Sequence, residues 1–228
     1  MAEALDMART AVDDGIDYAV MTPHLHPGLY ENTRSSTEGP LREFRAALRK
    51  EKIALEISVA AEVRLAVEIL PLLEQDEVPF LGEMDGYRIM LLEFPHTHIT
   101  HGAENLIQKL LDKKIRPIIA HPERNKDVIR DLAKIEPFVE MGCLLQLTAS
   151  AVAGHFGKEP HLCARQLLER GLVNVLATDA HNLKGRRPLL REGAAAAAKI
   201  IGEDAAQDLV EKNPLQILGL DSRFELVV

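Results

Sequence analysis

The chain alternates between short apolar segments and longer amphipathic segments along most of its length. This alternation is typical of parallel β-strands joined by helices, because a crossover between parallel strands needs a connection about as long as a helix. The strand-like segments are 16–21, 53–60, 88–94, 116–120, 144–147 and 173–178; the helix-like segments are 2–14, 37–51, 66–74, 104–113, 127–141 and 158–170, with two or three more helices between 189 and 219. The pattern predicts an α/β fold, either a barrel or an open parallel sheet.

The length of the chain sets the number of domains. With 228 residues it can build one α/β domain with a substantial core. No linker, low-complexity stretch or block of like charges divides it. We therefore expect residues 1–228 to form a single domain.

Composition excludes several classes of protein. The formal net charge is −8, with acidic and basic residues mixed throughout, and this disfavours a surface for nucleic acid. No apolar run reaches the length of a membrane span, and the first residues lack the features of a signal peptide. Only Cys143 and Cys163 could form a disulfide, and each stands alone among apolar residues. The sequence predicts a cytoplasmic protein that is not integral to a membrane.

Acidic and imidazole side chains follow five of the predicted strands. In a parallel βα barrel the carboxyl ends of all strands meet on one face, so these side chains are expected to share one cleft. Taken singly, each could be a helix cap or a hydrogen-bonded loop residue. Three imidazoles and three carboxylates together suit Zn²⁺, Mn²⁺ or Fe²⁺. The candidate metal ligands are His24, Glu62, Glu93, His121, Asp179 and His181.

Two arginines follow these candidate ligands closely along the chain. Arg124 comes three residues after His121, and Arg186 comes five residues after His181. A guanidinium group offers a planar fork that matches the oxygens of a phosphate, so both indicate an anionic substrate. The alternative is that each arginine pairs with a neighbouring carboxylate.

Six short motifs occur in a recognisable order. They are Thr-Pro-His at 22–24, Glu-Val-Arg at 62–64, Leu-Leu-Glu-Phe-Pro at 91–95, Ile-Ala-His-Pro-Glu-Arg at 119–124, Gln-Leu-Thr-Ala at 146–149 and Ala-Thr-Asp-Ala-His-Asn at 177–182. Together they resemble the bacterial protein-tyrosine phosphatases of the polymerase-and-histidinol-phosphatase (PHP) superfamily, which are encoded with capsule and exopolysaccharide genes. The resemblance extends from the first helix to segment 213–218, which is nearly the whole chain.

The resemblance implies a fold, a reaction and a partner. It implies a distorted (β/α)₇ barrel that holds two or three divalent ions, most commonly Mn²⁺, with Fe²⁺ or Zn²⁺ as alternatives. It implies hydrolysis of phosphotyrosine on a protein, expected to be the C-terminal tail of a tyrosine kinase that controls polysaccharide export, by a metal-activated hydroxide. Some relatives form homo-oligomers. The six candidate ligands match metal ligands of the family, and Arg124 and Arg186 match its phosphate-binding arginines. The absence of a Cys-x₅-Arg stretch agrees with a reaction that needs no cysteine nucleophile.

The chain departs from the family at its start. Family members open with a strand that carries Asp-x-His-x-His, and this chain has no counterpart of that motif. We therefore expect a barrel without its first strand. The natural start could lie upstream, or the chain could be short. Two other functions also remain open: a small-molecule phosphatase similar to histidinol phosphatase, and an impaired remnant that only binds a phosphoprotein.

Further histidines lie close to the candidate ligands. His26 could face the same cleft as His24. His96, His98 and His101 follow Glu93, and although their spacing could attract a metal, they are interpreted as part of an exposed polar loop.

Overall fold

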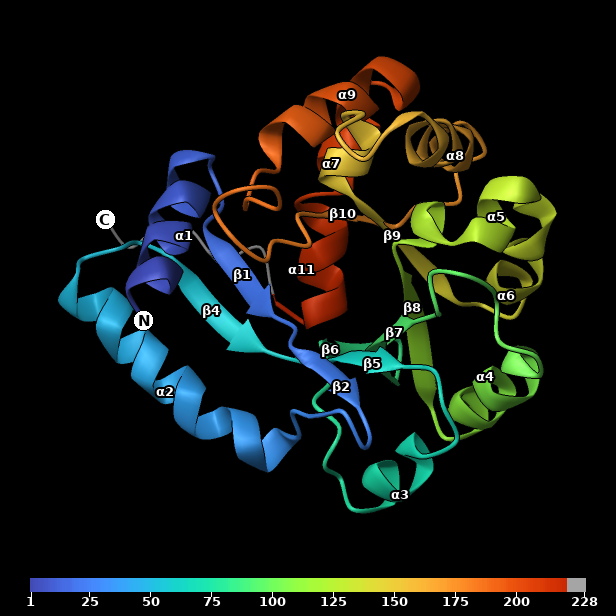
Figure 1. Cartoon of the computed structure of the whole chain (residues 1–228), viewed down its shortest axis with the longest axis horizontal. Coiled ribbons are helices and arrows are strands. Elements are labelled where there is room, and N and C mark those ends of the chain that lie inside the picture. Colours follow the sequence, from blue (N-terminus) through green and yellow to red (C-terminus); the bar gives the residue numbers. More distant parts are fainter. Residues whose placement is uncertain (221–228) are drawn as a thin grey trace.

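The computed structural model describes residues 1–220, in which helices surround a mixed β-sheet (Figure 1). The strands are β1 Tyr18–Met21, β2 His24–His26, β3 Tyr30–Glu31, β4 Glu56–Val59, β5 Glu62–Arg64, β6 Gly82–Met84, β7 Tyr87–Glu93, β8 Ile115–Ala120, β9 Leu144–Thr148 and β10 Val175–Ala177. The α-helices are α1 Ala2–Asp13, α2 Arg34–Lys50, α3 Ile69–Glu74, α4 Ala103–Asp112, α5 Lys126–Arg130, α6 Glu136–Glu140, α7 Ala149–Val152, α8 Lys158–Glu169, α9 Arg191–Ile201, α10 Glu203–Asp208 and α11 Lys212–Leu218, and two 3₁₀ turns are η1 Pro122–Arg124 and η2 Leu132–Lys134. The α/β prediction is confirmed.

The main sheet is mostly parallel. Its strand order is β10-β9-β8-β7-β5-β2-β3, with β6 also paired to β7. Only the β2–β3 and β6–β7 pairs are antiparallel. Within residues 1–220, no pairing joins β10 to β1 or β2, so the strands that the structure describes do not close into a ring.

The first two predicted strands each continue past a bend. Met21 pairs with Val59 in the β1–β4 ladder, and His24 pairs with Glu62 at the same offset in the β2–β5 ladder. Backbone hydrogen bonds of 2.9 Å and 3.1 Å, from Ala60 N to Met21 O and from Glu62 N to Pro23 O, span the gap between the ladders. The predicted ends of segments 16–21 and 53–60 agree with β1 and β4, but His24 and Glu62 each begin a further short strand, β2 and β5. Pro23 has no N–H to give to the ladder, and each strand resumes after the interruption.

Both faces of the central strands are buried. Along β7 the buried side chains alternate, so that Met90 and Leu92 join the main core while Ile89 and Leu91 join a smaller one on the opposite face. Ile217 of α11 belongs to this smaller core. Strands buried on both faces read as continuous apolar runs, which is why segments 88–94 and 116–120 were recognisable in the sequence.

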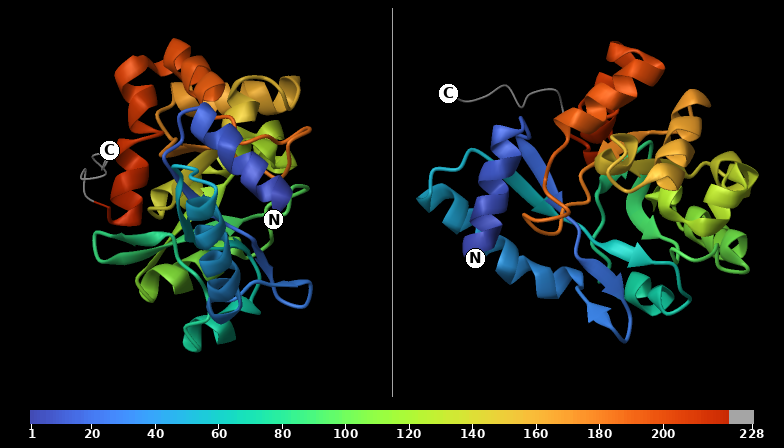
Figure 2. Two further views of the ribbon diagram at one scale, coloured as in Figure 1. Left: turned by 90° about the vertical axis from the view of Figure 1, so that its left-hand side faces the viewer. Right: turned by 45° about the horizontal axis from the view of Figure 1, so that its top comes forward.

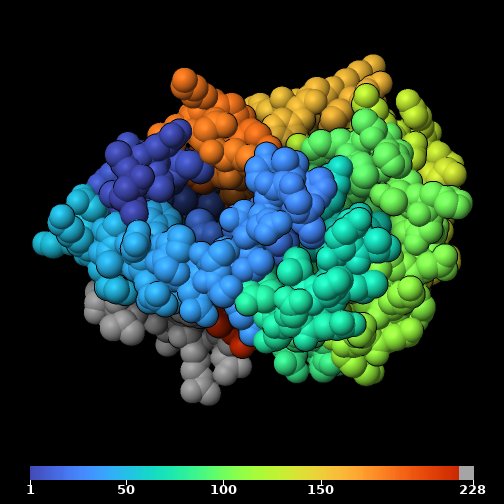
Figure 3. All heavy atoms as spheres, turned by 60° about the horizontal axis from the view of Figure 1, so that its bottom comes forward, coloured from blue at the N-terminus to red at the C-terminus, as the bar shows by residue number. Residues whose placement is uncertain are grey.

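Helices α1 and α2 form a separate layer beside β1 and β4 (Figure 2). Their contact is a third apolar cluster that includes Ala8, Leu48 and Ile57. On the face shown in Figure 3, this N-terminal part, coloured blue and cyan, lies against the green middle of the chain. None of the helices within residues 1–220 is both long and apolar enough to cross a membrane.

Segment 127–141 is divided rather than continuous. Asp131 adopts an extended backbone, with φ of −149° and ψ of 102°, and its carboxylate accepts a 3.1 Å hydrogen bond from Ala133 N. Helices α5 and α6 therefore lie on either side of η2. An aspartate that caps the following turn competes with the helix ladder, so this mostly helical segment is made of three short helical pieces.

Two helical glycines allow a matched test of packing. A Cβ added to Gly193 of α9 would lie 2.6 Å from Ala149 Cβ of α7 and 2.7 Å from its carbonyl oxygen, whereas a Cβ on Gly39 of α2 would meet no atom within 4 Å. We expect Gly193→Ala to lower the free energy of unfolding by about 1–3 kcal/mol. Gly39→Ala should raise it by up to about 1 kcal/mol because alanine favours helix. Urea unfolding of both variants checks this; equal shifts would contradict the close contact between α7 and α9.

Candidate metal and phosphate site

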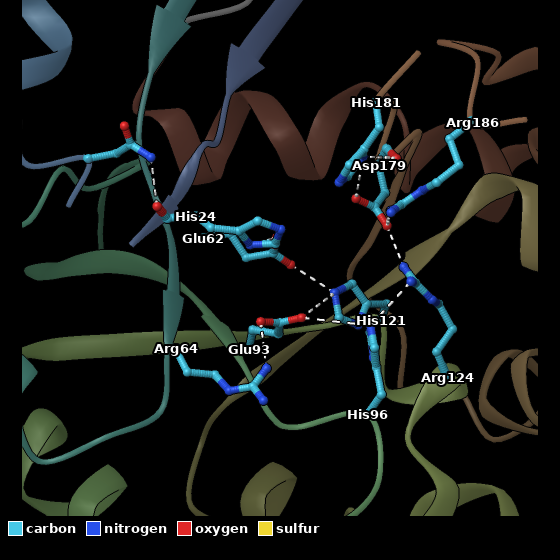
Figure 4. A network of polar contacts seen from close by, with 11 residues as sticks. His24, Glu62, Arg64, Glu93, His96, His121, Arg124, Asp179, His181 and Arg186 are labelled. Carbon is cyan, nitrogen blue, oxygen red and sulfur yellow. Dashed lines mark hydrogen bonds and ion pairs between the residues drawn. The ribbon is translucent and has the colours of Figure 1, made fainter. Parts of the chain in front are cut away.

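Four of the candidate ligands form one continuous network (Figure 4). Glu62, at the start of β5, lies at its centre: its Oε2 is 3.0 Å from Nδ1 of His24 on β2, and its Oε1 is 2.8 Å from Nε2 of His121, which follows β8. Glu93, the last residue of β7, places Oε1 3.7 Å from His121 Nε2. Because β2, β5, β7 and β8 are neighbours in the parallel part of the sheet, residues distant in sequence meet here.

The charges of this network are set by the carboxylate that the histidines share. Burial alone would raise the pKa of Glu62, but hydrogen bonds with His121 and His24 outweigh it and hold this pKa well below its usual range. The hydrogen bond to Glu62 raises the pKa of His24. An ionised carboxylate between two imidazoles can take a divalent cation in place of their protons.

Glu93 is held from its other side by an arginine. Arg64 at the end of β5 donates a 2.9 Å hydrogen bond from Nη1 to Glu93 Oε2. The Glu93 side chain is almost fully buried, so the guanidinium offsets the cost of its charge. Its Oε1 remains turned toward His121 (Figure 4).

The other two candidate ligands lie beside this network, with both arginines. Asp179 Oδ2 accepts hydrogen bonds from Arg124 Nη1, at 2.5 Å, and from Arg186 Nη2. His181 lies near Asp179, with Nδ1 3.6 Å from Oδ1, and its ring centroid is 6.1 Å from that of His24. The sequence analysis offered the alternative that each arginine pairs with a neighbouring carboxylate. Both arginines do so in this structure, and Asp179 is the carboxylate that they share.

The arginines also line a pocket. A hollow of about 420 Å³ is bordered by His96, Arg124, Phe156, Pro160 and Arg186. Within the part of the chain that the structure describes, the buried Nε of Arg186 has no hydrogen-bond partner. Two guanidinium groups that share one carboxylate leave a surplus of positive charge, which suits an anion such as a phosphate.

Two of the candidate ligands have an unusual backbone. His121 has φ of 36° and Asp179 has φ of 49°, both in the left-handed region. Non-glycine residues adopt this region at a cost, and such residues are concentrated at functional sites. Both residues follow a strand of the main sheet, where the sharp change of direction sends their side chains toward the shared cleft (Figure 4).

His96 is exposed, as predicted for its loop, and it also borders the network. Its Nε2 lies 4.0 Å from Glu93 Oε1 and 3.4 Å from Arg124 Nη2, and its ring centroid is 5.2 Å from that of His121. Burial and the charge of Arg124 lower the pKa of His96. His98 is exposed, as expected for that loop. The signal that could have found His96 is its position three residues after Glu93.

The donor atoms fit divalent cations. One ligand atom from each of Glu93, His96 and His121 lies within 4.8 Å of the others, and Glu62 joins His121 to His24. Imidazole nitrogens and carboxylate oxygens are the ligands that Mn²⁺, Fe²⁺ and Zn²⁺ share. The site thus offers the types of donor atom that these ions prefer. A small movement of the side chains would bring those atoms within reach of one ion.

The cysteines take no part in this site. Cys143 and Cys163 are buried, and burial raises the pKa of each thiol to about 12. We expect neither to react with a thiol-labelling reagent in the native protein at pH 8, because the thiolate is the reactive form. Mass spectrometry should show labelling only after unfolding; rapid labelling of the native chain would contradict this burial.

Comparisons with known proteins agree with this geometry. Residues 1–219 match the model of the family described as "Capsular polysaccharide synthesis, CpsB/CapC". Tyrosine-protein phosphatase YwqE of Bacillus subtilis is 33% identical, over 94% of this chain and 83% of its own length. Tyrosine-protein phosphatase CpsB of Streptococcus pneumoniae is 28% identical, over 90% of this chain and 85% of its own length.

A solved structure gives the same result. It comes from work on YwqE of B. subtilis and CpsB of S. pneumoniae, described as unique metal-dependent tyrosine phosphatases. It superposes with a TM-score of 0.87 at 30% identity, covering 96% of this chain and 88% of that one. Since the family match spans nearly all of the described residues, the chain belongs to the CpsB/CapC family of capsular polysaccharide synthesis proteins.

Proposed function

We propose that this protein is a metal-dependent phosphatase that hydrolyses phosphotyrosine in proteins. The observation that carries the proposal is the contact of Asp179 with both Arg124 and Arg186, beside the network of His24, Glu62, Glu93 and His121. It joins an anion-binding pocket to a set of metal-type donors, which is what hydrolysis of a phosphate ester requires. Membership of a family whose named relatives are tyrosine-protein phosphatases supports the choice of substrate.

Six residues would hold the metal. They are His24, Glu62, Glu93, His121, Asp179 and His181, for two or three divalent ions, with Mn²⁺ the first candidate and Fe²⁺ or Zn²⁺ also compatible with the donors. Bound ions would supply Lewis-acid polarisation of the phosphate and activation of water. Arg64 would orient Glu93 through its 2.9 Å hydrogen bond.

The arginines would bind and orient the phosphate. Each presents a planar set of donors that can hold two oxygens, which fixes the direction in which the ester bond points. Arg124 Cζ lies 5.3 Å from the centre of the Phe156 ring, so an aromatic face borders the place where the phosphate would sit. That face suits a phenolic leaving group better than a small polar one.

A cysteine phosphoenzyme has no support. Both thiols are buried, and with pKa values of about 12 they are protonated at neutral pH. Neither cysteine therefore serves as the nucleophile, and we propose that the phosphoryl group is transferred directly to water.

The family context suggests the physiological partner. We place the substrate in the cytoplasmic C-terminal tail of a bacterial tyrosine kinase that controls polysaccharide synthesis or export, since the family is described by its part in capsular polysaccharide synthesis. Assembly into a homo-oligomer belongs to the same proposal, and light scattering on the purified chain tests it.

Substrate profiling with metal control tests the function. The chain is stripped with a chelator, reloaded with Mn²⁺, and offered a phosphotyrosine peptide, a phosphoserine peptide and histidinol phosphate. We expect hydrolysis of the phosphotyrosine peptide that disappears on stripping and returns on reloading. Turnover of histidinol phosphate alone would replace the proposal with a small-molecule phosphatase. Peptide binding without any turnover would favour a binding remnant.

A further inference from the structure

We infer that His96 is a metal ligand of this chain: its Nε2, together with Glu93 Oε1 and His121 Nε2, forms a cation site at the mouth of the arginine pocket. This inference rests on the proposed metal-dependent function and adds to the six predicted ligands a residue that the sequence analysis interpreted as part of an exposed polar loop. One donor atom from each residue lies within 4.8 Å of the other two, and the residues come from the end of β7, the loop after it and the turn after β8.

The distances fit a shared ion. Glu93 Oε1 is 3.7 Å from His121 Nε2 and 4.0 Å from His96 Nε2. Two atoms that each lie about 2.1 Å from one ion are separated by at most about 4.2 Å. Both pairs that involve Glu93 are inside that limit, and the two imidazoles each offer a nitrogen within 4.8 Å of the other, so a small movement of the half-exposed His96 ring would let one ion contact all three residues.

The ring of His96 already presents the correct nitrogen. Arg124 Nη2 points at His96 Nε2 from 3.4 Å, and a guanidinium can only donate a hydrogen bond. Nε2 therefore faces the pocket as an acceptor, and an ion bound to it would take the place of Arg124 as its partner. The positive charge of Arg124 is itself paired with Asp179.

The backbone of the loop is fixed where it carries this ring. Lys126 N donates a 2.9 Å hydrogen bond to His96 O, and Asn125 Nδ2 donates a 2.7 Å hydrogen bond to Pro95 O. Further along, Ile99 N donates a 3.0 Å hydrogen bond to Asp127 Oδ2. These bonds tie the loop to the start of α5, so His96 keeps its position without help from an ion. Ligands held in advance in this way lose less entropy when an ion binds.

His98 provides a matched control. It lies two residues further along the same loop and is exposed, and its Nδ1 contacts Thr97 Oγ1 at 2.9 Å. It belongs to the same loop but makes none of the three contacts of His96, which are with Glu93, Arg124 and His121. Because His96 is itself half-exposed, replacing it should leave the fold intact, and thermal unfolding of the metal-free variants can verify this.

Metal binding to the full chain tests the inference without an activity assay. The chelator-stripped protein is titrated with Co²⁺, and the visible absorption of the ion is followed. We expect His96→Ala to weaken the binding of one ion by at least about tenfold, while His98→Ala matches the wild type. Identical isotherms for all three proteins would overturn the inference.

A cysteine scan gives a direct signature of contact. His96→Cys should produce a thiolate-to-cobalt charge-transfer band in the near ultraviolet, and His98→Cys should not. Cys143 and Cys163 are buried and protonated, so the wild type gives no background. No band in His96→Cys, with Co²⁺ bound and the wild type active, would reject His96 as a ligand and leave the proposed phosphatase intact. A wild type that binds no ion and hydrolyses without metal would overturn both.

Discussion

Replacing Arg124 with alanine is expected to lower kcat/KM for a phosphotyrosine peptide by about 100–1000-fold, the usual cost of losing one group that stabilises charge on a reacting anion. Arg124 lines the pocket and contacts Asp179, so the variant loses the fork that would bind two phosphate oxygens. Arg124→Lys keeps the charge but loses the fork, and should recover only a small part of the rate. Steady-state kinetics with Mn²⁺ in excess measures both variants.

The metal content of these variants separates two roles for Arg124. If it binds phosphate, Arg124→Ala retains the ions of the wild type, because Arg186 still holds Asp179. Loss of an ion along with the rate would instead mean that Arg124 serves to orient Asp179. Arg130→Ala is the control: this arginine lies on α5, is largely exposed and pairs only weakly with Asp127, at 3.6 Å. Its rate should match the wild type within twofold, since exposed pairs of this kind contribute little.

Replacing Glu62 with glutamine should affect metal binding more than any other single conservative change. Both carboxylate oxygens of Glu62 face an imidazole, His24 on one side and His121 on the other. An amide of the same size has no negative charge and only one accepting atom, so it cannot serve both sides. We expect at least one ion to bind about 100-fold more weakly, with a comparable loss of phosphotyrosine hydrolysis.

Mass spectrometry of bound metal after dialysis at limiting Mn²⁺ checks this expectation. Glu56→Gln is the matched control, because Glu56 lies on β4, in line with β5, but is exposed. It undergoes the same chemical change on the same pair of strands and should keep its ions. Full metal occupancy and full activity in Glu62→Gln would show that the network is structural.

The sequence predicted best those parts of the fold in which burial is continuous. β7 and β8 are buried on both faces beyond Arg88 and Arg116, so residues 89–92 and 117–120 form apolar runs with a clear end at Glu93 and at His121. It predicted least well where pairing continues across an interruption. β2 and β5 have three residues each, too few to show any period, and Pro23 suggests an end where the strand in fact resumes.

The same difference applies to the candidate site. Residues at strand ends could be located because a parallel sheet brings those ends together whatever the loops do. His96 could be suspected from its position after Glu93 but not distinguished from His98 and His101, because its place depends on hydrogen bonds between two loops about 30 residues apart in the chain, such as the 2.7 Å bond from Asn125 Nδ2 to Pro95 O. Nothing in local periodicity encodes such a bond. The pairing of both arginines with Asp179 is likewise visible only in the structure, although each arginine was a candidate phosphate-binding residue from the sequence.

The left-handed backbone at His121 and Asp179 has a consequence for evolution. Each non-glycine residue held there costs about 1–3 kcal/mol, which the rest of the protein must offset. Glycine at either position would relieve that cost and remove the functional side chain in the same step. In related proteins that are no longer selected for activity, substitution of these two residues by glycine would therefore increase the stability of the fold. A relative with glycine in place of His121 or Asp179 would then be expected to have lost catalytic activity while keeping its fold.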